Sequence, residues 1–207
     1  VPLKEDAYKY CDNTSDVARA LKAVNTLIVN KDGVYGDNTD PIGFEKSIAN
    51  RGLNNKLCLV LGAGGSARAV VYALTHMKCE IGIYNRTREN AELLCSDLGV
   101  EATVLTEKTI SEFIRSSQLV VNTTSLGQQE GEENNLIDFD SLNSSAHVYD
   151  LIYNPSRTTF LRRAEKNGCT VQNGLEMLIH QAAQSFNLWH DTMPEIDEDL
   201  MSVLGVN

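Results

Sequence analysis

The chain has 207 residues, which is long enough for one large domain or two small ones. Its formal net charge of -10 excludes nucleic-acid binding through a broad basic surface, and no run of Lys or Arg opposes that interpretation. No apolar run approaches the ~20 residues of a membrane-spanning helix, so we expect neither nucleic acid nor a membrane as a partner. An anion site in such an acidic chain must be local and made from a few basic side chains and backbone N–H groups.

The cysteine and histidine pattern does not indicate a metal centre. The five cysteines are an odd number without a C-x-x-C pair, and the four histidines show no ligand spacing. We therefore expect free thiols in a reducing compartment, a cytoplasmic location and no metal. The sequence begins at Val1 without Met or a signal peptide, which predicts a piece of a larger polypeptide.

The first part of the chain mixes helical and extended patterns. We expect a short extended start, then a helix at residues 15–22 and a two-stranded hairpin formed by 23–29 and 34–36. A second helix at 41–51 and a linker at 52–55 follow. Thr39 or Asp40 is a candidate cap for the second helix, with Pro41 at its first position.

From Lys56 the pattern changes to strands alternating with helices. The expected strands are 57–61, 80–84, 102–105, 119–122, 147–151 and 169–172, and the expected helices are 67–77, 89–98, 110–115, 159–167 and 175–189. The acidic tail from Asp191 predicts one further short helix. Repeated βα units predict an α/β fold with a parallel, Rossmann-like sheet.

A glycine-rich turn follows the first of these strands. Gly62, Gly64 and Ala67 fit the G-x-G-x-x-G/A spacing of a dinucleotide-binding turn. The first glycine permits a tight turn, the second leaves room for a pyrophosphate, and the helix N-terminus offers free N–H groups. The pattern also occurs in purely structural turns, so it requires support from elsewhere. The candidate cofactor residues here are Gly62, Ala63, Gly64, Gly65, Ser66 and Ala67.

The end of the second strand indicates which dinucleotide is bound. NAD-binding units usually carry Asp or Glu at this point, whereas this chain has Asn85-Arg86-Thr87-Arg88. Guanidinium groups would bind a 2′-phosphate that a carboxylate would repel, so these four residues favour NADP over NAD. The alternative is two solvated arginines at a helix start. An Arg there opposes the helix dipole, which favours an anionic partner.

Several motifs in consistent order resemble those of the shikimate dehydrogenases. Residues 36–43, Gly-Asp-Asn-Thr-Asp-Pro-Ile-Gly, resemble the G-x-N-T-D-x-x-G motif of that family, and Asn85-Arg86-Thr87 resembles its N-R-T. The remaining matches are Pro2-Leu3-Lys4, Ala23-Val24-Asn25-Thr26, Asn122–Gly127, Tyr153-Asn154-Pro155, and Gly174–Leu178 with Gln181-Ala182. The resemblance extends along nearly the whole chain.

This resemblance implies an NADP-dependent reduction of 3-dehydroshikimate to shikimate in aromatic amino acid biosynthesis. It implies a discontinuous α/β substrate domain made of residues 1–52 and 175–207, and an NADP-binding domain at residues 53–174. The catalytic Lys–Asp pair of the family falls on Lys4 and Asp40. A positioned ammonium can stabilise and protonate the oxygen of a carbonyl that receives a hydride.

Other site residues are carried over in the same way. Asn25, Asp40, Gln181 and Tyr153 match substrate-binding positions, and neutral amides suit a polyol because they both donate and accept hydrogen bonds. Thr124, Ser125, Gly174 and Met177 match positions on the nicotinamide side. Four of them also have a plain structural reading: Asn25 as a strand-end residue, Gln181 as a helix-face residue, and Tyr153 and Met177 as core residues.

Two departures from the family keep alternatives open. The family usually carries a Ser-x-Ser segment that binds the substrate carboxylate, at a position that would precede Val1, and Gln128 replaces a usual Met. The alternatives are a quinate/shikimate dehydrogenase of relaxed specificity and a non-catalytic, ligand-binding fragment of the same fold.

Overall fold

The computed structural model describes residues 3–129, 132 and 135–204, which form two compact units. One unit combines Val1–Ile48 with Glu176–Asn207, and the other is Ala49–Leu175. The chain therefore leaves the first unit once and returns to it with its last helices. The assignment of substrate binding to residues 1–52 and 175–207, and of NADP binding to 53–174, stays a prediction.

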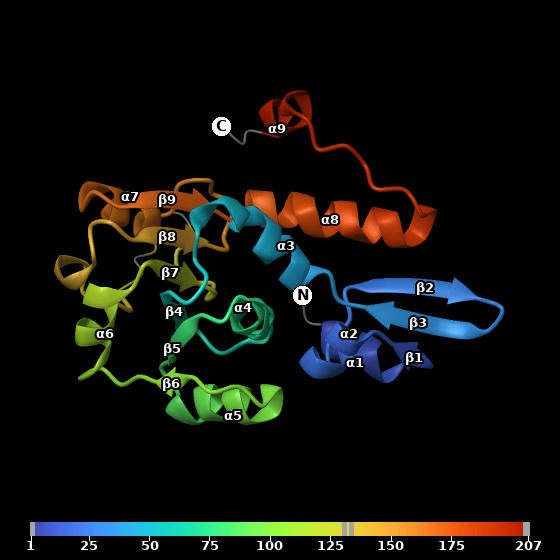
Figure 1. The fold of residues 1–207 in the computed structure, drawn as a ribbon, viewed down its shortest axis with the longest axis horizontal. Helices are drawn as coiled ribbons and strands as arrows, with labels where there is room; N and C mark the ends of the chain where they lie inside the picture. Colours follow the sequence, from blue (N-terminus) through green and yellow to red (C-terminus); the bar gives the residue numbers. More distant parts are fainter. Residues whose placement is uncertain (1–2, 130–131, 133–134, 205–207) are drawn as a thin grey trace. The chain divides into compact units, whose positions relative to one another are not determined.

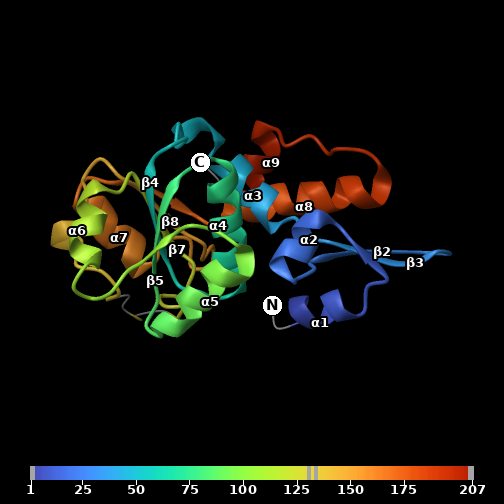
Figure 2. The ribbon, with the colours of Figure 1, turned by 60° about the horizontal axis from the view of Figure 1, so that its bottom comes forward.

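The first unit contains a three-stranded sheet in the order β1-β3-β2. Strands β2 (Thr26–Asn30) and β3 (Gly33–Asp37) form the expected antiparallel hairpin, and β1 (Asn13–Thr14) pairs in parallel with β3 (Figure 1). The helices of this unit are α1 (Lys4–Lys9), α2 (Asp16–Leu21), α3 (Asp40–Ser47), α8 (Leu175–His190) and α9 (Glu198–Val203). Helix α8 runs beside the hairpin in Figures 1 and 2, and the Trp189 indole N–H donates to Leu27 O at 3.0 Å.

The extended start predicted from the sequence is wrong, because this segment forms helix α1. None of the α1 residues is buried, so its sequence carries no apolar period that would have revealed a helix. Local charge stabilises it instead. Glu5 and Asp6 lie in its first turn and Lys9 in its last, and Lys9 Nζ contacts Asp6 Oδ1 at 2.9 Å.

The second unit is built on a six-stranded sheet in the order β6-β5-β4-β7-β8-β9, and every neighbouring pair is parallel. The predicted α/β class with a Rossmann-like sheet is therefore confirmed. The strands are β4 (Leu57–Leu61), β5 (Glu80–Tyr84), β6 (Thr103–Val104), β7 (Leu119–Asn122), β8 (His147–Asp150) and β9 (Thr170–Asn173). The strand order reverses between β4 and β7, which is where ligands bind in open α/β sheets.

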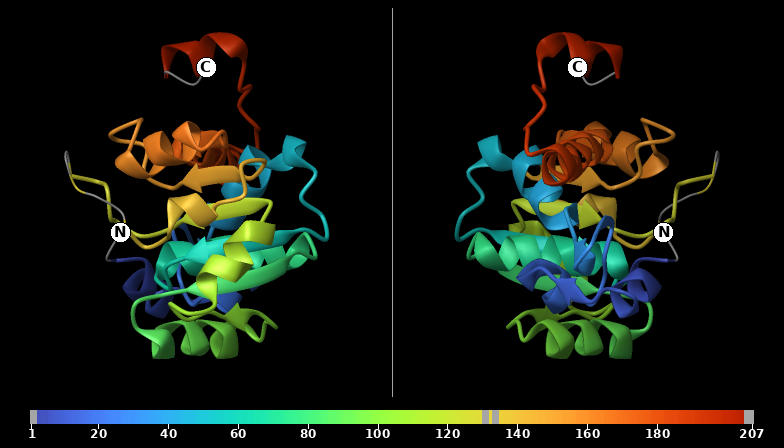
Figure 3. Two further views of the ribbon diagram at one scale, coloured as in Figure 1. Left: turned by 90° about the vertical axis from the view of Figure 1, so that its left-hand side faces the viewer. Right: turned by 90° about the vertical axis from the view of Figure 1, so that its right-hand side faces the viewer.

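Four helices cover the two faces of this sheet. Helices α4 (Gly65–His76) and α5 (Arg88–Leu98) lie on one face, and α6 (Ile110–Ser116) and α7 (Thr159–Lys166) on the other (Figures 1 and 3). Two short 3-10 turns, η1 (Ala49–Arg51) and η2 (Phe139–Ser141), complete the unit. Among the helices of residues 3–129, 132 and 135–204, none has the length and apolar character of a membrane span.

The core of the second unit explains why its elements were readable from the sequence. Leu59 and Leu61 of β4, Val120 of β7, Val148 of β8 and Phe160 of α7 pack in one buried apolar cluster. Strands buried on both faces read as continuous apolar runs, which the sequence shows directly. Most helix limits agree with those expected to within one residue, and two differ by more. Helix α4 begins at Gly65 rather than at residue 67, and α3 ends at Ser47 before the separate turn η1.

His147 is a buried polar residue within this sheet. Its Nδ1 lies 2.9 Å from Thr170 Oγ1 and its Nε2 lies 2.9 Å from Gln172 Oε1, both on the neighbouring strand β9. An amide oxygen only accepts, so Nε2 carries the hydrogen of the neutral ring and Nδ1 accepts from the threonine hydroxyl. Burial, assisted by the nearby charge of Arg51, lowers the pKa of His147 to about 4.

This shift predicts an acid-sensitive contribution to stability. The unfolded chain binds a proton at His147 near pH 6.5, whereas the folded chain does so only near pH 4. The free energy of unfolding should therefore fall as the pH drops through this window, by up to about 3 kcal/mol. Urea unfolding at several pH values measures the difference in the free energy of unfolding between the wild type and His147→Gln. This difference should shrink toward low pH. His190→Gln, at an exposed histidine, is the control, and a difference that is constant from pH 7 to 4.5 would contradict the assignment.

Candidate active site

The two residues predicted to be catalytic meet in the first unit. Asp40 begins helix α3 and is only 5% exposed, while Lys4 begins α1 and is partly buried. Lys4 Nζ donates to Asp40 Oδ2 at 2.5 Å across 36 positions of sequence. The backbone carbonyl of Lys4 also accepts from Val24 N–H at 2.9 Å, which ties α1 to the segment leading into β2. The contact provides an ammonium whose position is fixed by a buried carboxylate.

Asn25 holds the other oxygen of this carboxylate. Its Nδ2 donates to Asp40 Oδ1 at 2.8 Å and to Thr39 Oγ1 at 3.1 Å. Its Oδ1 accepts from Thr39 N–H at 2.9 Å and from the Thr26 hydroxyl at 2.9 Å. Since a backbone N–H can only donate, the Thr39 contact fixes which end of the amide faces Asp40. Both carboxylate oxygens thus have a defined partner.

The loop that precedes α3 is held by its own polar side chains. Asn38 Nδ2 donates to Ala23 O at 3.0 Å, and Asn38 Oδ1 accepts from Asp40 N–H at 3.1 Å. Asp37 Oδ1 accepts from Asn38 N–H at 2.7 Å and from the Ser15 hydroxyl. Thr39 occupies the predicted N-cap position, but its hydroxyl does not cap the helix. That expectation fails because the hydroxyl bonds to Asn25 and Ser185 instead.

Two residues of this network were missed by the sequence reasoning. Ser185 of α8 and Thr26 of β2 are both buried, and their hydroxyl oxygens lie 2.7 Å apart. Thr26 follows Asn25 inside a recognised motif and could have been proposed. Ser185 lies one helical turn after Gln181, which was the only available signal.

The other two predicted substrate residues are not joined to this network through their side chains. Gln181 is half-buried on α8, and its backbone carbonyl accepts from the Ser185 hydroxyl at 3.0 Å. Its side-chain amide forms no hydrogen bond with any residue that the structure describes. Tyr153 belongs to the second unit, follows β8 and is 49% exposed. Pro2 of the lysine motif lies outside the described residues.

The glycine turn of the second unit contains glycines of two kinds. Gly62 follows β4 with φ +108°, and a Cβ there would lie 2.5 Å from Thr123 Oγ1, so the protein itself requires this glycine. Gly64 and Gly65 are exposed, and a Cβ on either would meet nothing within 4 Å. Ala67 is fully buried, as the fingerprint requires for close helix–sheet packing.

The start of α4 is open to a ligand. Gly64 is its N-cap and provides no side-chain hydrogen bond to the first turn. The helix has 12 residues, so its N–H groups and dipole present partial positive charge at this end. Ala63 is half-buried and Ser66 is exposed beside it. Open space next to uncapped N–H groups fits a phosphate group of a dinucleotide.

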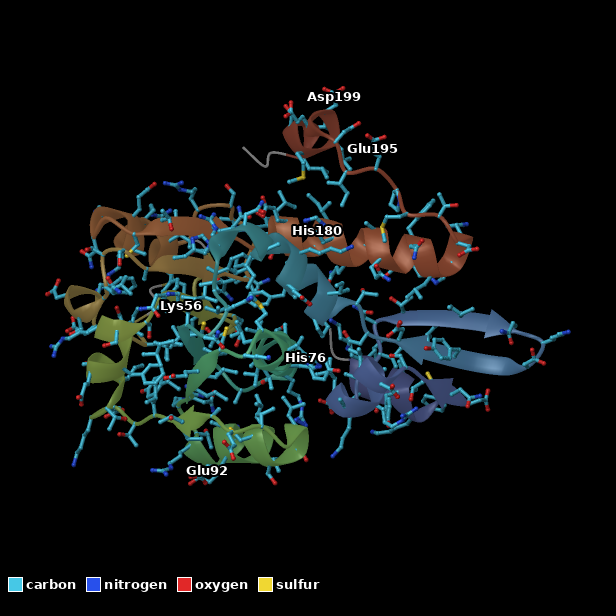
Figure 4. The ribbon with its side chains drawn as sticks, viewed as in Figure 1. Lys56, His76, Glu92, His180, Glu195 and Asp199 are labelled. Atoms are coloured by element: carbon cyan, nitrogen blue, oxygen red, sulfur yellow. The ribbon has the colours of Figure 1, made fainter. Side chains whose placement is uncertain are left out.

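The two arginines after β5 differ in their surroundings. Arg88 Nε donates to Glu92 Oε1 at 2.7 Å, one turn along α5, where Figure 4 labels Glu92. Arg86 is exposed and has no hydrogen-bond or ion-pair partner among the residues described. Asn85 Nδ2 donates to Thr87 O at 2.7 Å and so stabilises the turn that presents Arg86. Arg86 is therefore the more available of the two for an anion.

A buried polar cluster, also missed from the sequence, lies at the ends of β7 and β8. Asp150 is fully buried and accepts from Asn122 Nδ2 at 3.0 Å and from the Thr158 hydroxyl at 2.6 Å. Burial raises the pKa of Asp150 to about 6. The Thr124 hydroxyl donates to Asn122 Oδ1 at 2.7 Å, which orders the loop that carries exposed Ser125.

The loops after β7 and β8 also enclose a cavity of about 480 Å³. Its lining includes Gly127 and Gln128 after β7 and Asn154 after β8, together with Arg157 and Arg162, but no residue of the glycine turn. Within the described ranges no group of three or more His, Cys, Asp or Glu is arranged to hold a metal ion.

The last two predicted cofactor residues are both buried. A Cβ on Gly174 would lie 2.0 Å from Leu151 O, so close approach of the backbone alone accounts for that glycine. Met177 is 8% exposed on α8. Neither observation by itself indicates a contact with a cofactor.

Comparisons with known proteins identify the family. A family model described as Shikimate / quinate 5-dehydrogenase matches residues 45–136, and one described as Shikimate 5'-dehydrogenase C-terminal domain matches residues 174–204. The shikimate dehydrogenase (NADP(+)) of Caldicellulosiruptor bescii is 36% identical over 99% of this chain and 73% of that protein.

Solved structures agree with these matches. Shikimate 5-dehydrogenase from Thermus thermophilus, in complex with NADP(H) and shikimate, has a TM-score of 0.85 at 34% identity and covers 99% of this chain and 75% of that one. A chorismate mutase/shikimate 5-dehydrogenase fusion protein from Clostridium acetobutylicum has a TM-score of 0.84 at 34% identity. The match covers 100% of this chain and 74% of the fusion protein's chain. Fold and matches together define an α/β dehydrogenase. The chain belongs to the shikimate dehydrogenase family.

The helix contact behind Asp40 gives a stability prediction. A Cβ on Gly43 of α3 would lie 2.8 Å from Met177 O and 2.9 Å from Gln181 Cβ on α8. Gly43→Ala should therefore force the helices apart and lower the free energy of unfolding by about 1–3 kcal/mol. Urea unfolding measures this loss. Gly65→Ala, at a helix start with open space, is the matched control, and equal stability of the two variants would contradict the close approach.

Proposed function

We propose that this chain is an NADP-dependent oxidoreductase that interconverts 3-dehydroshikimate and shikimate, with Lys4 and Asp40 as its catalytic pair. The observation that carries this proposal is the 2.5 Å contact between Lys4 Nζ and buried Asp40, in a chain of the shikimate dehydrogenase family. Its relatives are NADP(+)-dependent, and the Thermus thermophilus enzyme was solved with NADP(H) and shikimate.

The chemistry of the pair suits this reaction. Bound NADPH supplies a hydride to the carbonyl carbon in the direction of reduction. Negative charge then develops on the carbonyl oxygen, where the Lys4 ammonium stabilises it and delivers the proton that completes the alcohol. Asp40 keeps the ammonium in place and, through its remaining lone pairs, can accept from a substrate hydroxyl. Asn25 fixes the carboxylate from the opposite side.

The fit of the second unit to NADP rests on its open glycines and on Arg86. The space at Gly64 and Gly65 and the uncapped start of α4 accommodate the pyrophosphate. Arg86 binds the 2′-phosphate, with Asn85 and Thr87 shaping its turn and Arg88 contributing less because Glu92 already holds it.

We assign the remaining predicted residues to the same two ligands. Gln181 has an uncommitted amide that can bind substrate hydroxyls, and Tyr153 is exposed enough to reach a ligand. Thr124 and Ser125 would contact the nicotinamide from the loop after β7, with Gly174 and Met177 as further candidates. All five cysteines are free thiols, which supports a reducing, cytoplasmic compartment.

Quinate is the alternative substrate, since the matching family model is described for both shikimate and quinate. Absorbance of NADPH, followed with shikimate or quinate and NADP, distinguishes the two by their kcat/KM. Lack of turnover with either substrate would favour the non-catalytic alternative and overturn the proposal. The fusion in Clostridium acetobutylicum also makes a larger polypeptide a reasonable setting for the chain.

Removal of the ammonium tests the catalytic pair. Lys4→Ala should lower kcat by about 10²–10⁴-fold, because the proton donor and its charge are both lost. The Kd for NADP should stay unchanged, since Lys4 is not among the proposed cofactor contacts and all of these except Met177 lie in the second unit. Lys9→Ala is the matched control on the same helix, where Lys9 is exposed and paired with Asp6. Comparable kcat losses in both variants would mean that Lys4→Ala lowers kcat by destabilising helix α1 and not by removing a catalytic group.

The choice of dinucleotide is tested at Arg86. Arg86→Ala should raise the Kd for NADP about 10- to 100-fold, in line with the ~1.5–3 kcal/mol of a hydrogen bond to a charged group. The Kd for NAD should barely change because NAD has no 2′-phosphate. Fluorescence titration with both dinucleotides measures this, and Arg88→Ala should have the smaller effect. A uniform loss for NADP and NAD would show that Arg86 does not contact the 2′-phosphate.

A further inference from the structure

Helix α8 places one buried hydroxyl behind the proposed catalytic pair. Ser185 is only 9% exposed on α8, one helical turn after Gln181. Its Oγ lies 2.7 Å from Thr26 Oγ1, 3.1 Å from Thr39 Oγ1 and 3.0 Å from Gln181 O. A buried polar group costs stability unless it is hydrogen-bonded, and these contacts satisfy the Ser185 hydroxyl.

These contacts are compatible with one consistent arrangement of the hydroxyl protons. Gln181 O can only accept, so the single proton of Ser185 points to it. Ser185 Oγ then has two lone pairs that can accept from the Thr39 hydroxyl and from the Thr26 hydroxyl, whose one proton is shared between Ser185 Oγ and Asn25 Oδ1. When Thr39 donates to Ser185, its own lone pairs remain available for Asn25 Nδ2 at 3.1 Å.

Without Ser185 the two threonine hydroxyls keep only one of the two acceptors that they now share, Asn25 Oδ1. Thr26 Oγ1 and Thr39 Oγ1 lie 2.9 Å and 3.3 Å from Asn25 Oδ1, which already accepts from Thr39 N–H. Three donors would then compete for one amide oxygen. The Thr39 hydroxyl, which accepts from Asn25 Nδ2, would also turn its own proton toward Asn25 Oδ1. The Asn25 Nδ2 group, which donates to Asp40 Oδ1, would then lose its fixed position.

We propose that Ser185 is a positioning residue for the reaction, acting through Thr39 and Asn25 to hold the Asp40 carboxylate toward Lys4. This inference rests on the proposed function, because Lys4 and Asp40 are its reacting pair. It assigns a role to a helix that contributes no group to the pair itself. In the part of the chain that the structure describes, every buried side-chain N or O atom has a partner, and Ser185 is one of the partners of Thr26 and Thr39.

The kinetic test compares substitutions of one hydroxyl. Ser185→Ala should lower kcat about tenfold, since a small displacement of a catalytic group slows the chemical step. The Kd for NADP should be unchanged. The primary deuterium isotope effect, measured with shikimate deuterated at the carbon that loses the hydride, should rise because hydride transfer becomes more rate-limiting. A loss of correctly folded protein would lower the rate without changing the isotope effect.

Control variants separate positioning from packing. Ser117→Ala removes a buried serine with the same hydrogen bond to the carbonyl four residues earlier, 3.0 Å long, but in the second unit. Its kcat and isotope effect should equal those of the wild type. Ser185→Thr retains the hydroxyl and should recover most of the rate. Ser185→Cys fills the same volume with a thiol, which is a weak hydrogen-bond donor, and replaces the alanine variant if that variant is unstable. Its kcat should stay as low as that of Ser185→Ala.

A double substitution shows whether Ser185 acts through Asn25. In an Asn25→Ala background, Ser185→Ala should lower kcat less than twofold further, because the amide it orders is already absent. Losses that multiply would overturn the proposal, as would a kcat and an isotope effect that Ser185→Ala leaves unchanged.

A measurement without substrate keeps this inference distinct from the proposed function. Exchange of the Asn25 side-chain amide hydrogens, followed by ¹⁵N NMR, should be faster in Ser185→Ala than in the wild type or in Ser117→Ala. If the wild type oxidises neither shikimate nor quinate, the proposed function fails and Ser185 has no reaction to serve. If the wild type is active and Asn25 exchange does not change, the positioning route through Asn25 is overturned.

Discussion

The buried carboxylate of Asp40 is the constraint on which the first unit depends. A carboxylate removed from water must be paired and hydrogen-bonded, or its burial is too costly to maintain. Here Lys4 and Asn25 each satisfy one oxygen, and they come from the start of α1 and the segment before β2. The close approach of α3 and α8 at Gly43 belongs to the same arrangement, because α8 supplies the hydroxyl that completes the hydrogen bonds of Thr39.

The second unit depends on a different constraint, which is the meeting of parallel strands at the reversal between β4 and β7. The three glycines of one turn illustrate the difference between folding and binding. Gly62 is required by its positive φ and by the side chain of Thr123, so any ligand-free protein with this turn would need it. A Cβ on Gly64 or Gly65 would meet nothing within 4 Å, so close packing inside the described structure does not account for these two glycines.

Sequence reasoning succeeded where local pattern decides structure and failed where distant contacts do. The strands β4, β7 and β8 are apolar runs between turns, so their positions were readable within a residue or so. Helix α1 buries nothing, and therefore has no pattern. The contact of Lys4 with Asp40 came from family resemblance, because no spacing rule joins residues 36 positions apart. Ser185 and Asp150 acquire their roles only through partners on other elements.

The contrast between Arg86 and Arg88 shows how far such reasoning can be refined. Two arginines separated by a single residue look equivalent when they are considered only as charges. Glu92, four residues after Arg88, is a partner that helical geometry makes available to Arg88 and denies to Arg86, which precedes the helix. The sequence therefore contained the distinction, in the spacing of an acidic residue outside the motif. A charge at a binding motif is available to a ligand to the extent that the chain has not already paired it, and that is decided by residues one helical turn away.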